Sequence, residues 1–194
     1  MDCFDANQAS KPCPAFKLVQ PLDLVHMMAF FKRTFAATCD LRHFYHQIPL
    51  NFSVQKWFTI LAKDPASGRS TFFTPSAYPM GWGWSCIKSQ SLSTLLSQAT
   101  PMGDSVEDDP YSFHELSGTG GVPPAFVEVR HKGRTCAWAG LYYDNFQVFA
   151  DSDHHRRALC HRFDRNCTYV NAEIKDQKPH RHADPNVLRG KHTV

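Results

Sequence analysis

The chain has 194 residues and a formal net charge of +3, a length typical of one compact domain and a charge too small to demand a nucleic-acid partner. It has no apolar run long enough to cross a membrane, and its first residues lack the basic start and apolar core of a secretory signal. Seven cysteines lie scattered without a repeated short spacing, which favours reduced thiols. We therefore expect an intracellular protein without a membrane partner; the sequence does not choose between nucleus and cytoplasm.

The first part of the chain predicts an extended opening, a helix and three strands. Prolines 12 and 14 disfavour regular structure, so residues 1–20 are expected to form an extended lead-in. Apolar residues at helical spacing predict a helix over residues 22–35. The expected strands cover residues 35–39, 55–62 and 70–74, and a turn-rich connection makes the last two a hairpin.

The remainder of the chain mixes helices, strands and one long irregular segment. Residues 99–124 are acidic and glycine-rich and predict a loop insertion, whereas residues 177–194 predict a polar tail. The other expected elements are a glycine-rich loop at 79–85, a helix at 87–98, strands at 125–131, 135–142 and 146–150, a helix at 154–166 and a strand at 168–174.

Two carboxylates follow apolar, strand-like runs and are candidate metal ligands. Asp40 ends the first of these runs, and Asp144 lies at the tip between two apolar and aromatic strands. Two divalent ions about 3.5–4 Å apart can activate a hydroxyl and stabilise a leaving oxygen, and oxygen-rich ligation suits Mg²⁺. Without any family context, the spacing favours the alternative of a helix cap at Asp40 and a tight turn at Asp144, because acidic residues are common in turns.

The sequence around both carboxylates resembles retroelement reverse transcriptases. Residues 38–50 (TCDLRHFYHQIPL) resemble the first catalytic motif of that family, in which a strand ends in Asp and an aromatic residue follows five positions later. Residues 73–85 resemble its Pro-x-Gly motif, and residues 142–145 resemble its Tyr-x-Asp-Asp hairpin. The three motifs occur in the order of the family. The resemblance extends from about residue 16 to about residue 178 and is greatest to retrotransposons of the tyrosine-recombinase (DIRS or VIPER) group.

The resemblance implies a fold, an activity and a set of site residues. The fold would be an α+β reverse-transcriptase palm with partial fingers over residues 21–176, built as an antiparallel sheet backed by helices. The activity would be RNA-directed DNA synthesis with Mg²⁺ or Mn²⁺, acting on an RNA or DNA primer-template and deoxynucleoside triphosphates. The implied metal ligands are Asp40, Asp144 and the backbone carbonyl of Leu41, and the implied nucleotide contacts are Tyr45, Met80, Gly81 and Trp82.

Two of these residues, and Lys175 further along the chain, also have interpretations that involve no role in catalysis. Tyr45 would lie under the incoming sugar and exclude a 2′-hydroxyl, but an ordinary core aromatic is the alternative. Trp82, like Trp84, is equally consistent with a structural role. Lys175 lies in residues 171–175, which resemble a later motif whose lysine protonates pyrophosphate. It is displaced by one residue from the usual pattern, so a solvated surface lysine is the alternative.

Other features depart from the family pattern. Asn145 replaces the second carboxylate of the hairpin, which removes one negative charge near the metals. The chain is also expected to lack the full fingers, the thumb and an RNase H domain. A truncated remnant without polymerase activity, with at most nucleic-acid affinity, is therefore the alternative function, and the oligomeric state is not predicted.

Two further classes of site find little support. A zinc site built from Cys160, His161, Cys167, His180 and His182 is disfavoured because the spacing matches no short-paired zinc pattern. A serine or cysteine hydrolase is disfavoured because the chain carries no Gly-x-Ser-x-Gly elbow.

Overall fold

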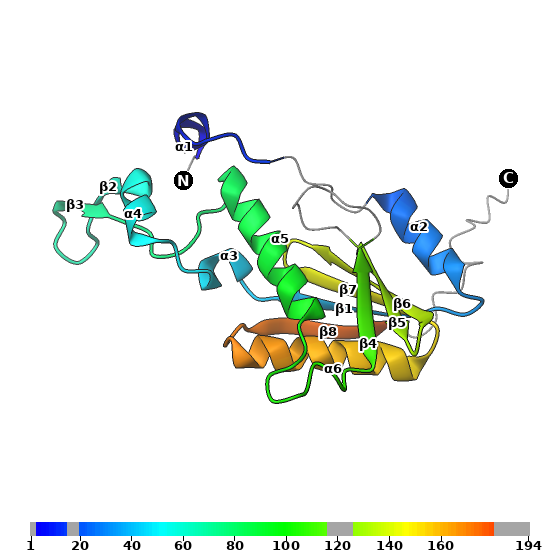
Figure 1. The fold of residues 1–194 in the computed structure, drawn as a ribbon. Coiled ribbons are helices and arrows are strands. Elements are labelled where there is room, and N and C mark those ends of the chain that lie inside the picture. Colours follow the sequence, from blue (N-terminus) through cyan, green and yellow to red (C-terminus); the bar gives the residue numbers. More distant parts are fainter. Residues whose placement is uncertain (1–2, 15–19, 116–125, 181–194) are drawn as a thin grey trace, which may run out of the picture. The chain divides into compact units, whose positions relative to one another are not determined.

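A computed structural model describes residues 3–14, 20–115 and 126–180, and these form two compact units (Figure 1). The first unit combines residues 3–14 with 43–89. The second combines residues 20–42 with the described residues from 90 onward. Helix α5 (Gly83–Gln98) crosses the boundary between them after Ser89. The described residues are therefore divided between two compact units.

The second unit is built on a six-stranded antiparallel sheet, which confirms the α+β class. The strands lie in the order β4-β5-β6-β7-β1-β8. Their bounds are Phe35–Leu41 for β1, Tyr111–Glu115 for β4, Phe126–His131 for β5, Arg134–Tyr142 for β6, Asn145–Ala150 for β7 and Ile174–His180 for β8. Strands β1, β6, β7 and β8, with α5 and α6 as connections, follow a split β-α-β-β-α-β path.

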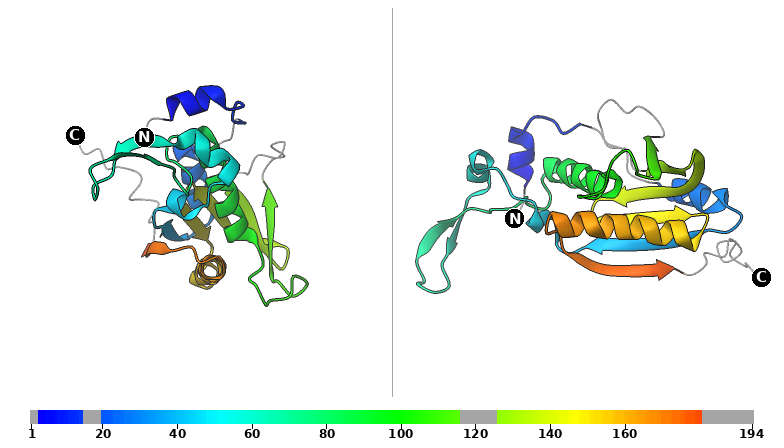
Figure 2. Two further views of the ribbon diagram at one scale, coloured as in Figure 1. Left: turned by 90° about the vertical axis from the view of Figure 1, so that its left-hand side faces the viewer. Right: turned by 60° about the horizontal axis from the view of Figure 1, so that its bottom comes forward.

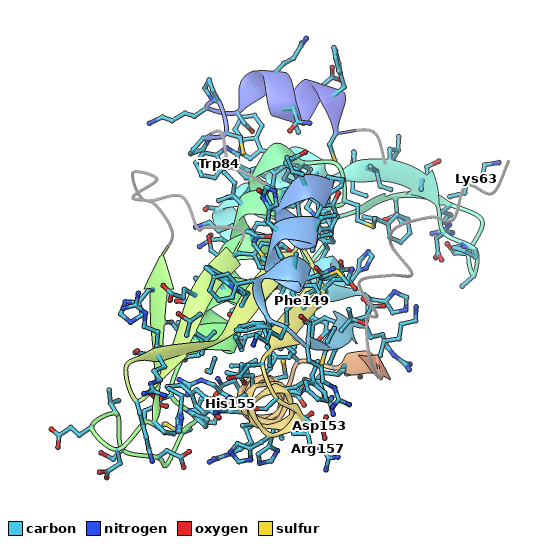
Figure 3. All side chains as sticks on the ribbon, turned by 90° about the vertical axis from the view of Figure 1, so that its right-hand side faces the viewer. Lys63, Trp84, Phe149, Asp153, His155 and Arg157 are labelled. Atoms are coloured by element: carbon cyan, nitrogen blue, oxygen red, sulfur yellow. The ribbon has the colours of Figure 1, made fainter. Side chains whose placement is uncertain are left out.

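Helix α6 (Asp153–Tyr169) covers one face of the sheet (Figures 1 and 2). Its Phe163 is fully buried and stacks on Phe146 of β7, with ring centroids 4.4 Å apart. At the start of the helix, the Ser152 hydroxyl accepts a hydrogen bond from the backbone N–H of His155, and Asp153 pairs with Arg157 (Figure 3). The cap and the acidic first turn both favour helix formation at this position.

The opposite face of the sheet packs against α2 (Pro21–Phe30). Neighbouring residues of a strand point to opposite faces, so Phe149 turns away from the face that carries Phe146. Phe149 forms a buried cluster with Met27 of α2, Ala36 of β1 and Phe126 of β5. The sheet therefore has an apolar core on both faces, and its central strands read as nearly continuous apolar runs in the sequence.

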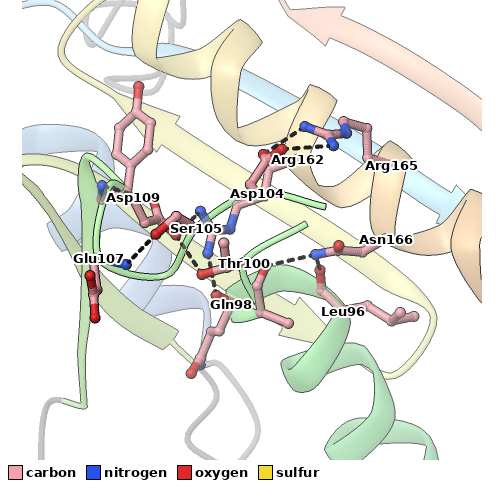
Figure 4. Close-up of polar contacts among 12 residues, drawn as sticks. Leu96, Gln98, Thr100, Asp104, Ser105, Glu107, Asp109, Arg162, Arg165 and Asn166 are labelled. Atoms are coloured by element: carbon pink, nitrogen blue, oxygen red, sulfur yellow. Dashed lines mark hydrogen bonds and ion pairs between the residues drawn. The ribbon is translucent and has the colours of Figure 1, made fainter. Parts of the chain in front are cut away.

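The loop between α5 and β4 is fixed to α6 by a buried ion pair (Figure 4). The Arg162 guanidinium lies 2.7 Å from the Asp109 carboxylate, and both side chains are less than a tenth exposed. Asp109 also accepts hydrogen bonds from the Thr100 hydroxyl and the backbone N–H of Tyr111. Burial opposes the ionised form, but these donors and Arg162 hold the Asp109 pKa below its ordinary value. The end of this loop next to β4 is thus anchored to α6.

The first unit consists of short helices, a two-stranded hairpin and the start of α5. Its apolar cluster contains Cys3, Leu50, Phe58 and Trp82. The elements are α1 (Phe4–Ala9), α3 (Phe44–Gln47), α4 (Phe52–Gln55), a 3-10 helix η1 (Lys56–Phe58), β2 (Ile60–Lys63) and β3 (Ser70–Phe73). All seven cysteines of the chain are free. Within the described ranges, no helix is long and apolar enough to span a membrane.

The structure corrects several predicted elements before α5. The lead-in is not wholly extended, because α1 occupies part of it. The helix predicted over 22–35 ends at Phe30, since Phe31 is already extended. The strand predicted over 55–62 starts only at Ile60, because the Asn51 side chain caps a helical turn by accepting from the Ser53 N–H.

The later corrections concern where regular structure begins and ends. The predicted insertion 99–124 contains strand β4, while residues 116–125 lie outside the described ranges. The strand predicted over 168–174 is wrong, because α6 continues to Tyr169. There the Asn166 amide donates to the Leu96 and Ala99 carbonyls and holds the last turns of α6 against α5. The strand forms instead over β8, which includes the first residues of the predicted tail; residues 181–194 lie outside the described ranges.

Gly140 on β6 is required by the aromatic ring that covers it. A Cβ atom at this position would lie 1.8 Å from the Phe126 ring on the paired strand, and that ring is buried in the α2 cluster. We expect Gly140→Ala to lower the free energy of unfolding by about 1–3 kcal/mol through overpacking. Urea denaturation measures the change. Gly83→Ala is the matched control, since its Cβ would meet an ordinary contact at 3.4 Å; equal stability of both variants would contradict the prediction.

Candidate active site

The two predicted carboxylates lie at one end of the sheet, Asp40 on β1 and Asp144 in the turn that precedes the neighbouring strand β7. Asp40 is inside β1 and not after it, and its register partner on β7 is Asn145. Asp144 occupies the turn between β6 and β7, and its carbonyl accepts a hydrogen bond of 2.9 Å from the backbone N–H of Leu41. The pairing of β1 with β7 therefore brings together two residues that are far apart in the chain.

The pairing between β1 and β8 is irregular at this point. Asp40 pairs with residue 176 and Leu41 with Ile174, so Lys175 is an extra residue on β8 and forms a bulge there. The Arg42 N–H donates to the Glu173 carbonyl at 2.9 Å, so the chains remain linked beyond the shift. Such bulges bend a strand and re-aim its side chains, and they are frequent next to active sites. The irregularity coincides with the two positions expected to supply a carboxylate and a carbonyl ligand.

Lys175, the second residue of β8, lies next to Asp40. Its ammonium nitrogen lies 3.6 Å from a carboxylate oxygen of Asp40, with the lysine side chain 57% and the aspartate 32% exposed. A second, more exposed pair links Arg42 to Glu173 at 3.7 Å. Exposed pairs of this kind contribute little to stability. Lys175 is thus near the carboxylates in spite of its displacement by one residue in the motif.

The electrostatic environment raises the pKa of Asp144. Burial is the largest cause, and the nearby charge of Asp40 acts in the same direction. Lys175 and the Asn145 side chain oppose the shift without cancelling it. The Asn145 amide donates to the Asp144 carboxylate at 3.2 Å. Two adjacent carboxylates in partial burial repel each other, and a bound cation would relieve that repulsion.

The turn that carries Asp144 is strained and is held by helix α5. Tyr143 has a φ of +56°, a left-handed conformation that a non-glycine residue adopts at an energetic cost. Its N–H donates to the Gln90 side-chain oxygen at 3.1 Å, and its carbonyl accepts from the Ser93 hydroxyl at 2.8 Å. Gln90 and Ser93 are fully buried. The helix therefore fixes both backbone groups of the residue next to Asp144.

Sequence reasoning missed this contact because it assigned an apolar stripe to α5. Leu95, one of the apolar residues of this helix, is 61% exposed. The buried face is polar instead, and its serines recur every four residues. Those serines are Ser85, Ser89, Ser93 and Ser97. The spacing is visible in the sequence and is the signal that could have identified the buried face.

The residues predicted to contact a nucleotide belong to the first unit. The Tyr45 hydroxyl donates to the Cys86 sulfur at 3.9 Å. Met80 is 62% exposed, and Gly81 has a φ of +91°, which explains the glycine at that position. Trp82 is buried between Phe58 and Tyr78, which favours the structural interpretation of that residue.

No cluster of three or more His, Cys, Asp or Glu side chains able to hold a metal ion occurs among residues 3–14, 20–115 and 126–180. Cys160 and Cys167 instead lie on α6, where Cys167 is buried and burial raises its pKa to about 12. His182 of the zinc alternative lies outside the described residues. The carboxylate pair Asp40 and Asp144 is the strongest candidate site that the structure offers.

Comparison with known proteins does not identify the chain. No protein-family model matches the sequence, and no curated protein matches it.

The hydrogen bonds from α5 to the Tyr143 backbone lead to a prediction about stability. We expect Gln90→Ala to lower the free energy of unfolding by about 1–3 kcal/mol, because the partly buried Tyr143 N–H loses its acceptor. We also expect faster amide hydrogen exchange at Tyr143, measured by NMR. Thr94→Ala is the control, since its hydroxyl bonds only within α5. Unchanged protection of the Tyr143 amide in Gln90→Ala would contradict the role of Gln90.

The raised pKa of Asp144 leads to a prediction about the pH dependence of stability. In metal-free buffer at pH 7 we expect Asp144→Asn to be more stable than the native chain, because a desolvated carboxylate beside Asp40 is removed. A raised folded-state pKa favours folding below the unfolded-state value of about 4, and this contribution is lost as pH rises through the folded-state value. The stability difference should therefore close on acidification. Urea denaturation at several pH values tests this, and a difference that grows toward low pH would contradict it.

Proposed function

We propose that this chain is a reverse-transcriptase palm that catalyses metal-dependent nucleotidyl transfer to a primer 3′-hydroxyl. The observation that carries the proposal is the convergence of Asp40, Asp144 and Lys175 at one end of an antiparallel sheet. All three were assigned from motifs that lie far apart in the sequence. Unrelated turn and cap residues would have no reason to meet at one place.

The carboxylate pair fits a divalent cation of the Mg²⁺ type. Asp40 and Asp144 would hold it through oxygen ligands, with the Leu41 carbonyl as a further ligand implied by the resemblance. The raised pKa of Asp144 reflects burial and the charge of Asp40, which are the conditions that a cation would relieve. When bound, the metal would supply Lewis-acid activation of the hydroxyl and charge stabilisation on phosphate oxygens.

The protein side chains would position and protonate the substrate. Lys175 would hold its proton near the phosphates and donate it to the leaving pyrophosphate, and its exposure of 57% leaves it free to reorient from Asp40. Asn145 would orient the Asp144 carboxylate through its amide hydrogen bond. In the first unit, Tyr45 would discriminate against ribonucleotides, as the resemblance implies. Met80 and Gly81 would contact the nucleotide and template.

One observation favours an inactive nucleic-acid-binding remnant as the second candidate function. Asn145 is the register partner of Asp40, so an uncharged residue stands where most members of the family carry a carboxylate. A site with less negative charge would bind a divalent cation more weakly. The remnant would bind primer-template without extending it.

Primer extension distinguishes these candidates. With Mg²⁺ or Mn²⁺, an RNA template and deoxynucleoside triphosphates, we expect the full chain to extend the primer. Asp40→Ala should reduce the rate about 10³-fold or more, because it removes a proposed metal ligand. Each tenfold loss of rate corresponds to about 1.4 kcal/mol of metal-dependent stabilisation. Lys175→Ala should lose about 100-fold and Lys175→Arg should lose less. The readout is single-turnover extension on a denaturing gel.

A carboxylate outside the site provides the matched control. Asp108→Ala changes an exposed acidic residue of the loop between α5 and β4 and should extend primers like the native chain. Extension that survives Asp40→Ala would contradict the proposed site. Absence of extension by the native chain, with retained binding of primer-template, would favour the remnant.

A further inference from the structure

The first unit contains a pocket of about 740 Å³ that the proposed polymerase function does not use. It lies among α1, the segment after α1, η1 and the start of α5. Five of its lining residues are aromatic, and Ala6, Ala9 and Val54 add further apolar surface. The aromatic residues are Trp57, Phe58, Tyr78, Trp82 and Trp84. Sites for small organic ligands typically have this size and this kind of lining.

Two of the three indoles have their polar atom already occupied. The Trp82 indole N–H donates to the Ser10 hydroxyl at 3.1 Å. The Trp84 indole N–H donates to the Lys11 carbonyl at 3.0 Å (Trp84 is labelled in Figure 3). A ligand in the pocket would therefore meet the carbon surface of these rings and not their donors. This surface favours a flat, apolar ring system.

The wall of the pocket is preformed. Trp82 stacks on Tyr78 with ring centroids 5.8 Å apart and meets Phe58 edge-on at 5.1 Å. The Asn7 amide joins α1 to the glycine-rich loop twice, by donating to the Gly81 carbonyl and accepting from the Gly83 N–H, both at 2.9 Å. A ligand would thus find its surface without ordering it first, which reduces the entropic cost of binding.

The charged residues of the pocket favour an anion. Lys11 and Lys88 line it, against one carboxylate from Asp5. A third lysine, Lys56, places its ammonium 5.6 Å from the ring centroid of Trp57, which lines the pocket and is 67% exposed. The excess of positive charge around an apolar interior matches a ligand with one charged group attached to its ring system.

We propose that this pocket binds a small molecule that combines a flat, apolar ring system with a single anionic group. The rings would lie against the tryptophans, and the anion would pair with Lys11 or Lys88 at the lining of the pocket. This site is independent of Asp40 and Asp144, which belong to the other unit. Its test therefore does not depend on polymerase activity.

The probe for this site is 1-anilinonaphthalene-8-sulfonate, and its uncharged relative N-phenyl-1-naphthylamine is the comparison. We expect saturable binding of one sulfonate probe per native chain, detected by energy transfer from tryptophan to the probe. Trp57→Ala should weaken both probes about tenfold, because it removes apolar contact. Lys88→Ala should weaken only the sulfonate, about threefold, as expected for a partly exposed charge pair.

Two control variants keep the test specific. Lys63→Ala removes a lysine of the same unit that lies outside the pocket, and Tyr169→Ala removes an exposed aromatic residue of the other unit (Lys63 is labelled in Figure 3). Both should bind the probes like the native chain, and circular dichroism confirms that each variant is folded. The proposal is overturned if the sulfonate does not bind, if Trp57→Ala binds it unchanged, or if Lys88→Ala weakens both probes equally.

Discussion

The pairing of β1 with β7 is the interaction on which the second unit depends. β1 lies between β7 and β8, so its backbone groups are satisfied on both sides only after the sheet has closed around it. The same pairing places Asp40 beside Asn145 and links Leu41 to the Asp144 carbonyl. A shift of one residue would turn Asp40 to the other face and bury it among apolar side chains. The register of the β1–β7 pairing therefore also determines where Asp40 and Asp144 lie.

Helix α5 also constrains the site, because its polar side chains hold the backbone of the turn that carries Asp144. A turn with a left-handed Tyr143 would normally require glycine at that position. The tyrosine is accommodated because Gln90 and Ser93 bond its N–H and its carbonyl from a fully buried helix face. Serines on that face also allow the helix to approach closely. The helix thus stabilises a conformation that the hairpin sequence alone does not favour.

The sequence was sufficient for the elements with strong periodicity and insufficient where tertiary contacts decide. The β6–β7 hairpin, helix α6 and the strand before Asp40 could be predicted because apolar alternation and capping are local signals. Strand β4 could not, because it follows a loop held by the ion pair between Asp109 and Arg162 of α6, and these two residues are far apart in the sequence. The position of Lys175 beside Asp40 accompanies a register shift in the pairing of β1 with β8, which no local pattern encodes. The polar face of α5 resisted prediction because hydrophobic periodicity describes burial only when the partner surface is apolar.

The order of the strands has a consequence for the chain as it is synthesised. Asp40 and its register partner Asn145 are about 100 residues apart, and the whole of residues 43–89 folds into a different unit between them. At about 5–20 residues per second, β1 remains without either neighbour for about 5–20 s after it is made. During that interval it is an apolar strand with two open edges, the form most prone to wrong pairing. The strand that carries the candidate catalytic residue is therefore also the segment of the nascent chain most in need of protection.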